Sequence, residues 1–159
     1  MILMGNAGAG KSTMARLMAD NGRIPLLSLD EIAWNDGIQR IPFDESVQLL
    51  HEFIATNDEW IIEGCYGDLI EAAIPACTEL RFLNPAVETC VANCQSRPFE
   101  PEKWASPKEQ QAHLAQLIEW VRTYESRNDE FGLARHRRIF DSHQGVKREY
   151  TRLADFDSL

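Results

Sequence analysis

The feature that most constrains this chain is its first turn between a strand and a helix. Residues 5–12 read Gly5-Asn6-Ala7-Gly8-Ala9-Gly10-Lys11-Ser12 and fit the pattern G-x-x-x-x-G-K-[ST] at every fixed position. Glycines let such a loop curl around a phosphate without clashes from Cβ atoms, so its N–H groups can point inward. An apolar run precedes the loop and a helical pattern follows it. We therefore expect a nucleoside triphosphate site here.

The residues at the end of the loop have separate expected functions. The helix that follows directs the positive end of its dipole at a phosphate. Lys11 is expected to reach the β and γ phosphates, Ser12 to place its hydroxyl on Mg²⁺, and Thr13 to approach the α-phosphate. The expected nucleotide-binding set is Gly5, Asn6, Ala7, Gly8, Ala9, Gly10, Lys11, Ser12 and Thr13. A glycine-rich turn without a ligand is the alternative, and the flanking patterns disfavour it.

Composition limits the class of protein. With 159 residues and 44% hydrophobic content, the chain can form one core, and we expect one domain over residues 1–159. The sequence contains no run of about 18 apolar residues, so we expect no membrane span. No secretory signal pattern precedes the loop, which favours the cytoplasm. The cysteines are then expected to be reduced, with Cys90 and Cys94 as core residues rather than metal ligands.

Charge is distributed unevenly along the chain. The net charge of −9 opposes broad electrostatic binding to nucleic acid. Between Ser28 and Leu80, twelve acidic residues stand against Arg40 alone. Between Arg122 and Arg152, basic residues outnumber acidic ones by eight to five. A solvated helix face is the alternative explanation for each run.

Strand-like runs alternate with helical patterns throughout the chain. Strands are expected at 2–4, 26–29, 60–63, 80–83 and about 147–151. This alternation predicts an α/β fold with a parallel sheet covered by crossover helices. Ser106-Pro107-Lys108-Glu109 fits a capping box at the start of a helix. Segments 35–42 and 98–106 fit neither pattern, and we expect irregular flaps there.

Several motifs together resemble one branch of the P-loop kinases. They are the glycine-rich loop, Leu29-Asp30-Glu31-Ile32-Ala33-Trp34, Trp60-Ile61-Ile62-Glu63-Gly64, Arg97, and Arg127-Asn128-Asp129-Glu130 followed by Arg138. The chain resembles the adenylate kinase-like and shikimate kinase-like group, in particular small kinases described as DNA topology modulation proteins. The resemblance implies a three-layer P-loop NTPase fold with a five-stranded parallel sheet in the order 2-3-1-4-5. It also implies ATP with Mg²⁺, a short lid at about 97–107 and an acceptor-binding region at about 30–58.

The chain also departs from this group. Adenylate kinases have an arginine for the acceptor phosphate shortly after the third strand, where this chain has Cys65-Tyr66-Gly67-Asp68. Shikimate kinases have a glycine triplet there, which is also missing. These departures count against a nucleoside monophosphate and against shikimate as the acceptor. The acidic stretch points instead to a neutral or cationic acceptor, such as a nucleoside, a sugar-like alcohol or an amino alcohol.

The candidate catalytic residues follow from these motifs. They are Lys11, Asp30, Arg97, Arg127 and Arg138, with Arg135 as an alternative to Arg138 because the two lie one helical turn apart. Asp30, expected at the end of the second strand, is the candidate base for an acceptor hydroxyl, with a helix cap as the alternative. Glu63 is expected to hold Mg²⁺ through water. Trp34 and Tyr66 either stack on an acceptor ring or pack in the core.

The sequence therefore predicts an ATP-dependent kinase for a small-molecule acceptor, because phosphoryl transfer needs positioning and charge neutralisation. Two alternatives stay open. One is a nucleoside monophosphate kinase. The other is a P-loop ATPase or nucleotide-sensing module without a dedicated acceptor.

Overall fold

Five parallel strands form the centre of the molecule. The computed structural model describes residues 1–20, 22–35, 39–99, 101 and 105–152. The strands are β1 (Ile2–Gly5), β2 (Leu26–Ser28), β5 (Ile61–Gly64), β6 (Glu79–Leu83) and β7 (Val146–Tyr150), in the order β2-β5-β1-β6-β7. The predicted α/β fold with a five-stranded parallel sheet flanked by helices is confirmed. Every predicted strand boundary lies within one residue of the observed boundary.

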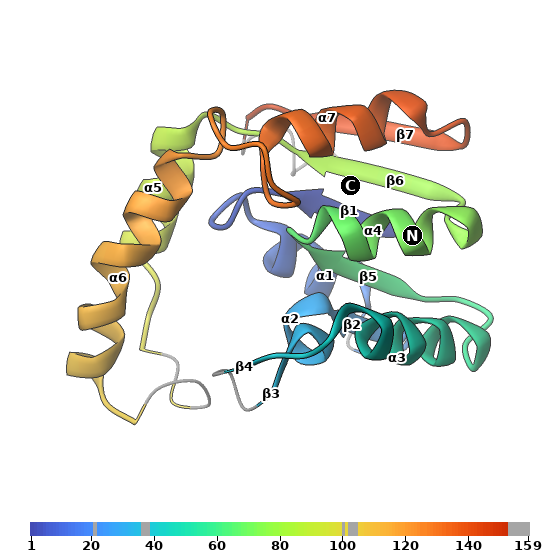
Figure 1. The fold of residues 1–159 in the computed structure, drawn as a ribbon, viewed down its shortest axis with the longest axis horizontal. Coiled ribbons are helices and arrows are strands. Elements are labelled where there is room, and N and C mark those ends of the chain that lie inside the picture. The colour runs from blue at the N-terminus through green and yellow to red at the C-terminus, as the bar shows by residue number, and fades with distance from the viewer. Residues whose placement is uncertain (21, 36–38, 100, 102–104, 153–159) are drawn as a thin grey trace.

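Side chains that alternate along β1 explain why both faces of the sheet carry helices. Ile2 and Met4 face one core and Leu3 faces the other, and all three are fully buried. Figure 1 shows the helices on the two sides of the sheet. The first core is covered by α2 (Leu29–Ala33), α3 (Phe43–Ala55), α4 (Gly67–Ala73) and α7 (Leu133–Ser142), and the second by α1 (Lys11–Met18), α5 (Val87–Gln95) and α6 (Pro107–Arg122). A 3-10 turn, η1 (Ile74–Ala76), follows α4.

A two-stranded hairpin lies outside the large sheet, where the sequence analysis expected an irregular segment. Strands β3 (Trp34–Asn35) and β4 (Gln39–Arg40) are antiparallel, with Trp34 opposite Arg40. Residues 36–38 of the expected flap lie outside the described residues. Because the hairpin stands between β2 and β5 in the chain, the large sheet carries the labels 1, 2, 5, 6 and 7.

Helix α6 begins at the predicted capping box. The Ser106 hydroxyl accepts a hydrogen bond from the Glu109 N–H at 3.2 Å, and the Glu109 carboxylate accepts one from the Ala105 N–H at 3.0 Å. Residues 100 and 102–104 of the predicted lid lie outside the described part of the chain. Helices α5 and α6 pack together and stand at one end of the sheet (Figure 1). They therefore face the loops that follow the strands.

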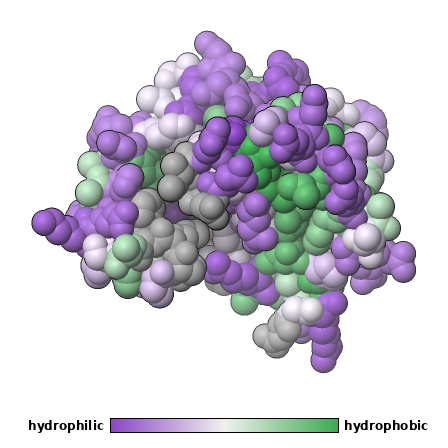
Figure 2. Space-filling model, turned by 60° about the horizontal axis from the view of Figure 1, so that its bottom comes forward, coloured by the Kyte–Doolittle hydropathy of each residue, from purple (hydrophilic) through white to green (hydrophobic). Residues whose placement is uncertain are grey.

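The surface and the cysteines complete the description of the fold. Hydrophilic residues cover much of the face shown in Figure 2, and apolar residues gather on its right side. Leu17 is the most exposed of the large hydrophobic residues described, at 69%. No helix in the described residues combines the length and the apolar character that crossing a bilayer requires. Cys90 and Cys94 are buried with free thiols, which confirms their predicted place in the core.

Candidate functional site

A cavity of about 930 Å³ lies over the carboxyl ends of β1 and β5. Its walls come from the glycine-rich loop, α2, the hairpin, the segment after β5, the end of α5, and α6 with the loop that follows it. Ligands of open α/β sheets bind at this edge. The volume also falls in the usual range for small-molecule sites, about 300–1,000 Å³. We therefore take this cavity as the candidate site.

The glycine-rich loop, residues 5–12, connects β1 to α1 and requires glycine for two reasons. Gly8 and Gly10 have φ angles of +79° and +94°, a region that other residues rarely adopt. A Cβ atom on Gly8 would also lie 2.3 Å from the carbonyl oxygen of Cys90 in α5. Asn93 of α5 donates a hydrogen bond from Nδ2 to the Gly8 carbonyl at 2.8 Å. Helix α5 thus packs directly on the loop and fixes its path.

Lys11, the first residue of α1, lines the cavity although it is only 8% exposed. Its Nζ donates to the Asn6 carbonyl oxygen at 2.9 Å. An ammonium group has three N–H donors, so this hydrogen bond leaves capacity for a ligand. The N–H groups of Lys11, Ser12 and Thr13 also have no acceptor inside α1, because a helix leaves its first N–H groups unpaired. This end of the cavity fits a phosphate chain.

Ser12 and Glu63 meet in the same part of the cavity. The Ser12 hydroxyl donates to Glu63 Oε1 at 3.0 Å, and the Ser28 hydroxyl donates to the same oxygen at 2.9 Å. Hydroxyl and carboxylate oxygens suit Mg²⁺, which completes its shell with water and phosphate. Among the residues described, no three His, Cys, Asp or Glu side chains are grouped to hold a metal. Ser12 and Glu63 therefore fit a Mg²⁺ ion that arrives with a phosphate ligand.

Asp30 lies in the first turn of α2 and not at the end of β2, so its predicted place in the secondary structure was wrong. The strand ends at Ser28, and the chain turns into the helix at Leu29, which is fully buried. The Asp30 side chain still lines the cavity. Partial burial, together with the charges of Glu63 and Asp30, raises the pKa of Glu31, so carboxylates are concentrated near the end of β2.

Tyr66 connects Asp30 to the hairpin. Its hydroxyl donates to Asp30 Oδ1 at 2.5 Å and accepts from Trp34 Nε1 at 2.7 Å. Burial and the Asp30 charge raise the pKa of Tyr66, so the hydroxyl keeps the proton that it donates. The ring of Tyr66 also makes an edge contact with Phe131, with 5.2 Å between centroids. Tyr66 therefore holds Asp30 in one orientation.

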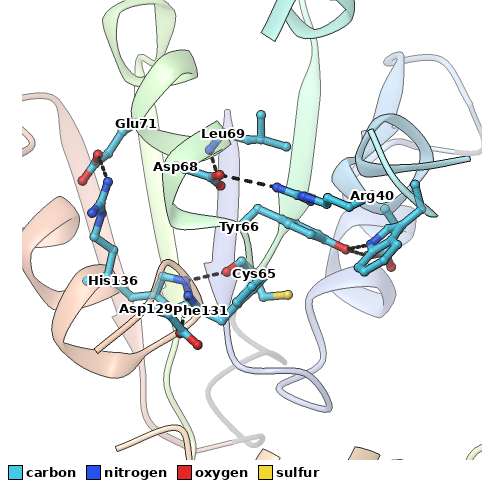
Figure 3. A network of polar contacts seen from close by, with 12 residues as sticks. Arg40, Cys65, Tyr66, Asp68, Leu69, Glu71, Asp129, Phe131 and His136 are labelled. Atoms are coloured by element: carbon cyan, nitrogen blue, oxygen red, sulfur yellow. Dashed lines mark hydrogen bonds and ion pairs between the residues drawn. The ribbon is translucent and has the colours of Figure 1, made fainter. Parts of the chain in front are cut away.

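Arg40 reaches from β4 across the ring of Tyr66. Its Cζ lies 4.7 Å from the Tyr66 centroid and 5.9 Å from the Trp34 centroid. Its Nη2 lies 3.4 Å from Asp68 Oδ2 (Figure 3). Its Nη1 is buried, with no hydrogen-bond partner in the part of the chain that the structure describes. Arg40 stands out in the sequence as the one basic residue between Ser28 and Leu80, but no role at the site was predicted for it.

His136, a buried histidine of α7, connects the segment after α6 to the segment after β5 that lines the cavity. His136 Nε2 lies 2.9 Å from the Cys65 carbonyl oxygen, and its Nδ1 lies 2.7 Å from the Tyr124 hydroxyl. A carbonyl oxygen only accepts, so Nε2 carries the proton and Nδ1 accepts from Tyr124. Burial lowers the pKa of His136 to about 4. The Gly67 N–H donates to the Glu130 carbonyl at 2.8 Å and holds the same loop.

The structure brings three of the five predicted catalytic residues to the cavity. Lys11, Asp30 and Arg97 line it, whereas Arg127 and Arg138 are not among the lining residues described. The catalytic assignments themselves stay predictions.

Local contacts explain where these two arginines lie. The Arg127 guanidinium stacks on Trp120, 4.1 Å from the ring centroid, and donates from Nη2 to Thr123 Oγ1 at 2.7 Å. Arg138 on α7 is 64% exposed, with its Nη2 3.9 Å from Glu71 Oε1. The alternative Arg135 donates a hydrogen bond to the same carboxylate of Glu71. Each arginine is thus engaged with neighbouring helices.

The cavity also contains residues that the sequence analysis missed. Arg16 lies four residues after Ser12, so it shares a helix face with Ser12, and that spacing was a usable signal. Glu130 was part of the motif Arg127-Asn128-Asp129-Glu130 but had no predicted role, and it lines the cavity. Phe131 reaches the cavity from the same loop, which the Gly67 N–H holds, and no local pattern indicated it. Cys65 lines the cavity as well, but burial raises the pKa of its thiol to about 12, which makes it a poor nucleophile.

Comparison with known proteins does not show a family for this chain. No protein-family model and no curated protein matches the chain. Among solved structures, the chain is similar to an uncharacterized protein from Eubacterium ventriosum ATCC 27560, with 18% sequence identity and a TM-score of 0.49. The match covers 99% of this chain and 93% of that protein.

Proposed function

We propose that the protein is an ATP-dependent kinase that transfers the γ-phosphoryl group to a hydroxyl of a small acceptor. The observation that carries this proposal is the cavity itself. Lys11 and the Ser12–Glu63 pair line its phosphate end, and Asp30, held by Tyr66, lines the same cavity. In this proposal the sheet and the glycine-rich loop form a P-loop nucleotide-binding fold. When β3 and β4 are left out and the five strands of the large sheet are numbered along the chain, their order across the sheet is 2-3-1-4-5, which supports that assignment.

The transfer assigns one task to each group. The acceptor oxygen forms a bond to the γ-phosphorus, the bond from that phosphorus to the β–γ bridging oxygen breaks, and ADP leaves with the electron pair. The acceptor proton passes to the Asp30 carboxylate. Lys11 and Arg97 neutralise the charge on the phosphoryl oxygens. Mg²⁺, held by Ser12 and Glu63, would add positive charge at the phosphate chain.

The alternative is an ATPase or nucleotide-sensing module without a dedicated acceptor. Acceptor-dependent ADP release separates the two functions. We expect one chemical class to stimulate ADP release in a panel of nucleosides, nucleoside monophosphates, sugars, sugar phosphates, amino alcohols and hydroxy acids. Asp30→Asn should remove this stimulation without preventing ATP binding, because it removes the proton acceptor alone. An equal response to every compound would reject the kinase and favour the ATPase.

A further inference from the structure

We propose that the acceptor carries an oxyanion, a phosphate or a carboxylate, in addition to its hydroxyl, and that Arg40 binds this oxyanion. In this arrangement Tyr66 is a positioning residue, because it holds both Asp30 and Arg40. The inference rests on the proposed function, and it names the class of acceptor for the same cavity.

The charge of the cavity differs from the charge of the chain segment around it. The stretch 28–80 contains twelve acidic residues, but of those described only Asp30 and Glu63 line the cavity. The basic side chains in the described lining are Lys11, Arg16, Arg40 and Arg97, and Glu130 is the one further acid. A neutral or cationic acceptor was expected from the acidic stretch, but most of the described acids of that stretch do not line the cavity, whereas Arg40 does.

Arg40 has unused hydrogen-bonding capacity in the right place. A guanidinium carries five N–H donors, yet Nη1 is buried and has no hydrogen-bond partner among the described residues. The contact described for Nη2 is the one with Asp68 at 3.4 Å, and the other oxygen of that carboxylate accepts from the Leu69 N–H at 2.8 Å. A planar guanidinium with free donors matches phosphate and carboxylate oxygens. The weak pairing with Asp68 leaves Arg40 available for such a ligand.

The contacts of Arg40 separate it from the phosphate end. They are with Tyr66, Trp34 and Asp68, all on the hairpin or just after β5. The contacts described for Lys11 and Ser12 are with Asn6 and Glu63 instead. Arg40 therefore belongs to the Asp30 part of the cavity, where the acceptor is expected.

Tyr66 fixes the spacing of this two-point site. Its hydroxyl holds Asp30 Oδ1 at 2.5 Å, and its ring supports the Arg40 guanidinium at 4.7 Å. The side chain is only 4% exposed and packs against Phe131, so it is held in place. One rigid ring thus sets the separation between the proton acceptor and the oxyanion anchor, and it selects small acceptors that match this separation.

Calorimetric titration with inorganic phosphate and with acetate tests the oxyanion site. The titrations use the full chain, with and without Mg²⁺ and a non-hydrolysable ATP analogue, so binding of the analogue is measured separately. We expect Arg40→Gln to weaken the binding of at least one of the two anions about tenfold or more. Arg40→Lys should give a smaller loss, because the charge remains without the planar fork. Arg23→Gln is the matched control, since Arg23 is an exposed arginine paired only with Asp20 among the contacts described.

Equal affinity of Arg40→Gln and the unchanged protein for both anions would overturn the inference. A protein that fails to bind the ATP analogue but still shows Arg40-dependent anion binding would instead reject the proposed function and leave this site standing. The two failures are therefore distinguishable.

Two substitutions of Tyr66 test the positioning. Tyr66→Phe keeps the ring under Arg40 and removes the hydroxyl on Asp30, so we expect kcat for the best acceptor to fall about tenfold or more with unchanged anion affinity. Tyr66→Leu removes both supports, and both quantities should fall. Loss of anion affinity in Tyr66→Phe equal to that in Arg40→Gln would contradict the separate tasks of hydroxyl and ring.

Discussion

At the scale of single residues, the site depends on a few polar side chains whose partners leave room for a ligand. Lys11 has one hydrogen bond to the loop, and Glu63 accepts two hydroxyl groups on a single oxygen. Glu63 is 5% exposed, so its charge lies in a poorly solvated place. A bound cation would compensate that charge, which is why we expect these residues to act together with Mg²⁺.

Glu63→Gln tests this expectation. The amide keeps an oxygen that can accept from Ser12 and Ser28 but loses the charge, so we expect the Mg²⁺ concentration for half-maximal ATP binding to rise about tenfold or more. Glu119→Gln, an exposed carboxylate beside Arg122, is the control. The same Mg²⁺ dependence in the unchanged protein and in both variants would show that Glu63 does not hold Mg²⁺.

At the scale of elements, much of the cavity around Lys11 was predictable from the sequence, and much of the cavity around Asp30 and Arg40 was not. The loop has a fixed spacing of glycines and lysine, and the strands are short apolar runs, so both were visible in the sequence. The hairpin consists of two strands of two residues, too short for alternation to mark them. Arg40 joins the site by stacking on a ring distant in the chain. The Arg127 guanidinium stacks on Trp120, but Arg127 lies beyond the end of α6 at Arg122, so no helical spacing in the sequence indicated this contact.

The contact between the loop and α5 gives a prediction at this scale. Gly8→Ala introduces a Cβ atom 2.3 Å from the Cys90 carbonyl oxygen and also strains φ, so we expect a loss of about 2–4 kcal/mol in unfolding free energy, together with weaker ATP binding. Gly22→Ala is a matched control, because its φ of +85° is similar but no heavy atom lies within 4 Å. Urea unfolding measures the loss of unfolding free energy in each of the two variants. Equal losses in the two variants would show that backbone strain alone matters and that α5 does not constrain the loop.

At the scale of the whole molecule, a buried side chain connects the helices to the segment that follows β5 beside the cavity. His136 is fully buried and joins α7 to Cys65 after β5 and to Tyr124 after α6. Because it is held neutral, its protonation is coupled to folding of the whole chain. Burial is the main cause of the lowered pKa of His136, the hydrogen bond to the Cys65 carbonyl opposes it, and the charges of Lys11 and Asp129 have smaller effects of opposite sign.

This coupling predicts how stability depends on pH. The pKa of His136 falls from 6.5 to about 4 on folding, so the unfolded chain binds the proton first. Stability is therefore fully present above pH 6.5 and falls as the pH drops toward 4, by on the order of 3 kcal/mol from this residue. Urea unfolding between these pH values should show a steeper dependence in the unchanged protein than in His136→Gln. The same slope in both would mean that His136 is not held neutral.

The most direct test of the central claim is the equilibrium binding of ATP with Mg²⁺, measured by calorimetry. We predict one ATP per chain in the unchanged protein and in Lys108→Ala, whose lysine is exposed on α6. In Lys11→Ala the affinity should fall about tenfold or more, because a largely buried ammonium no longer meets the phosphates. Absence of ATP binding to the unchanged protein, or equal affinity in Lys11→Ala, would contradict the assignment of the cavity as a nucleotide site.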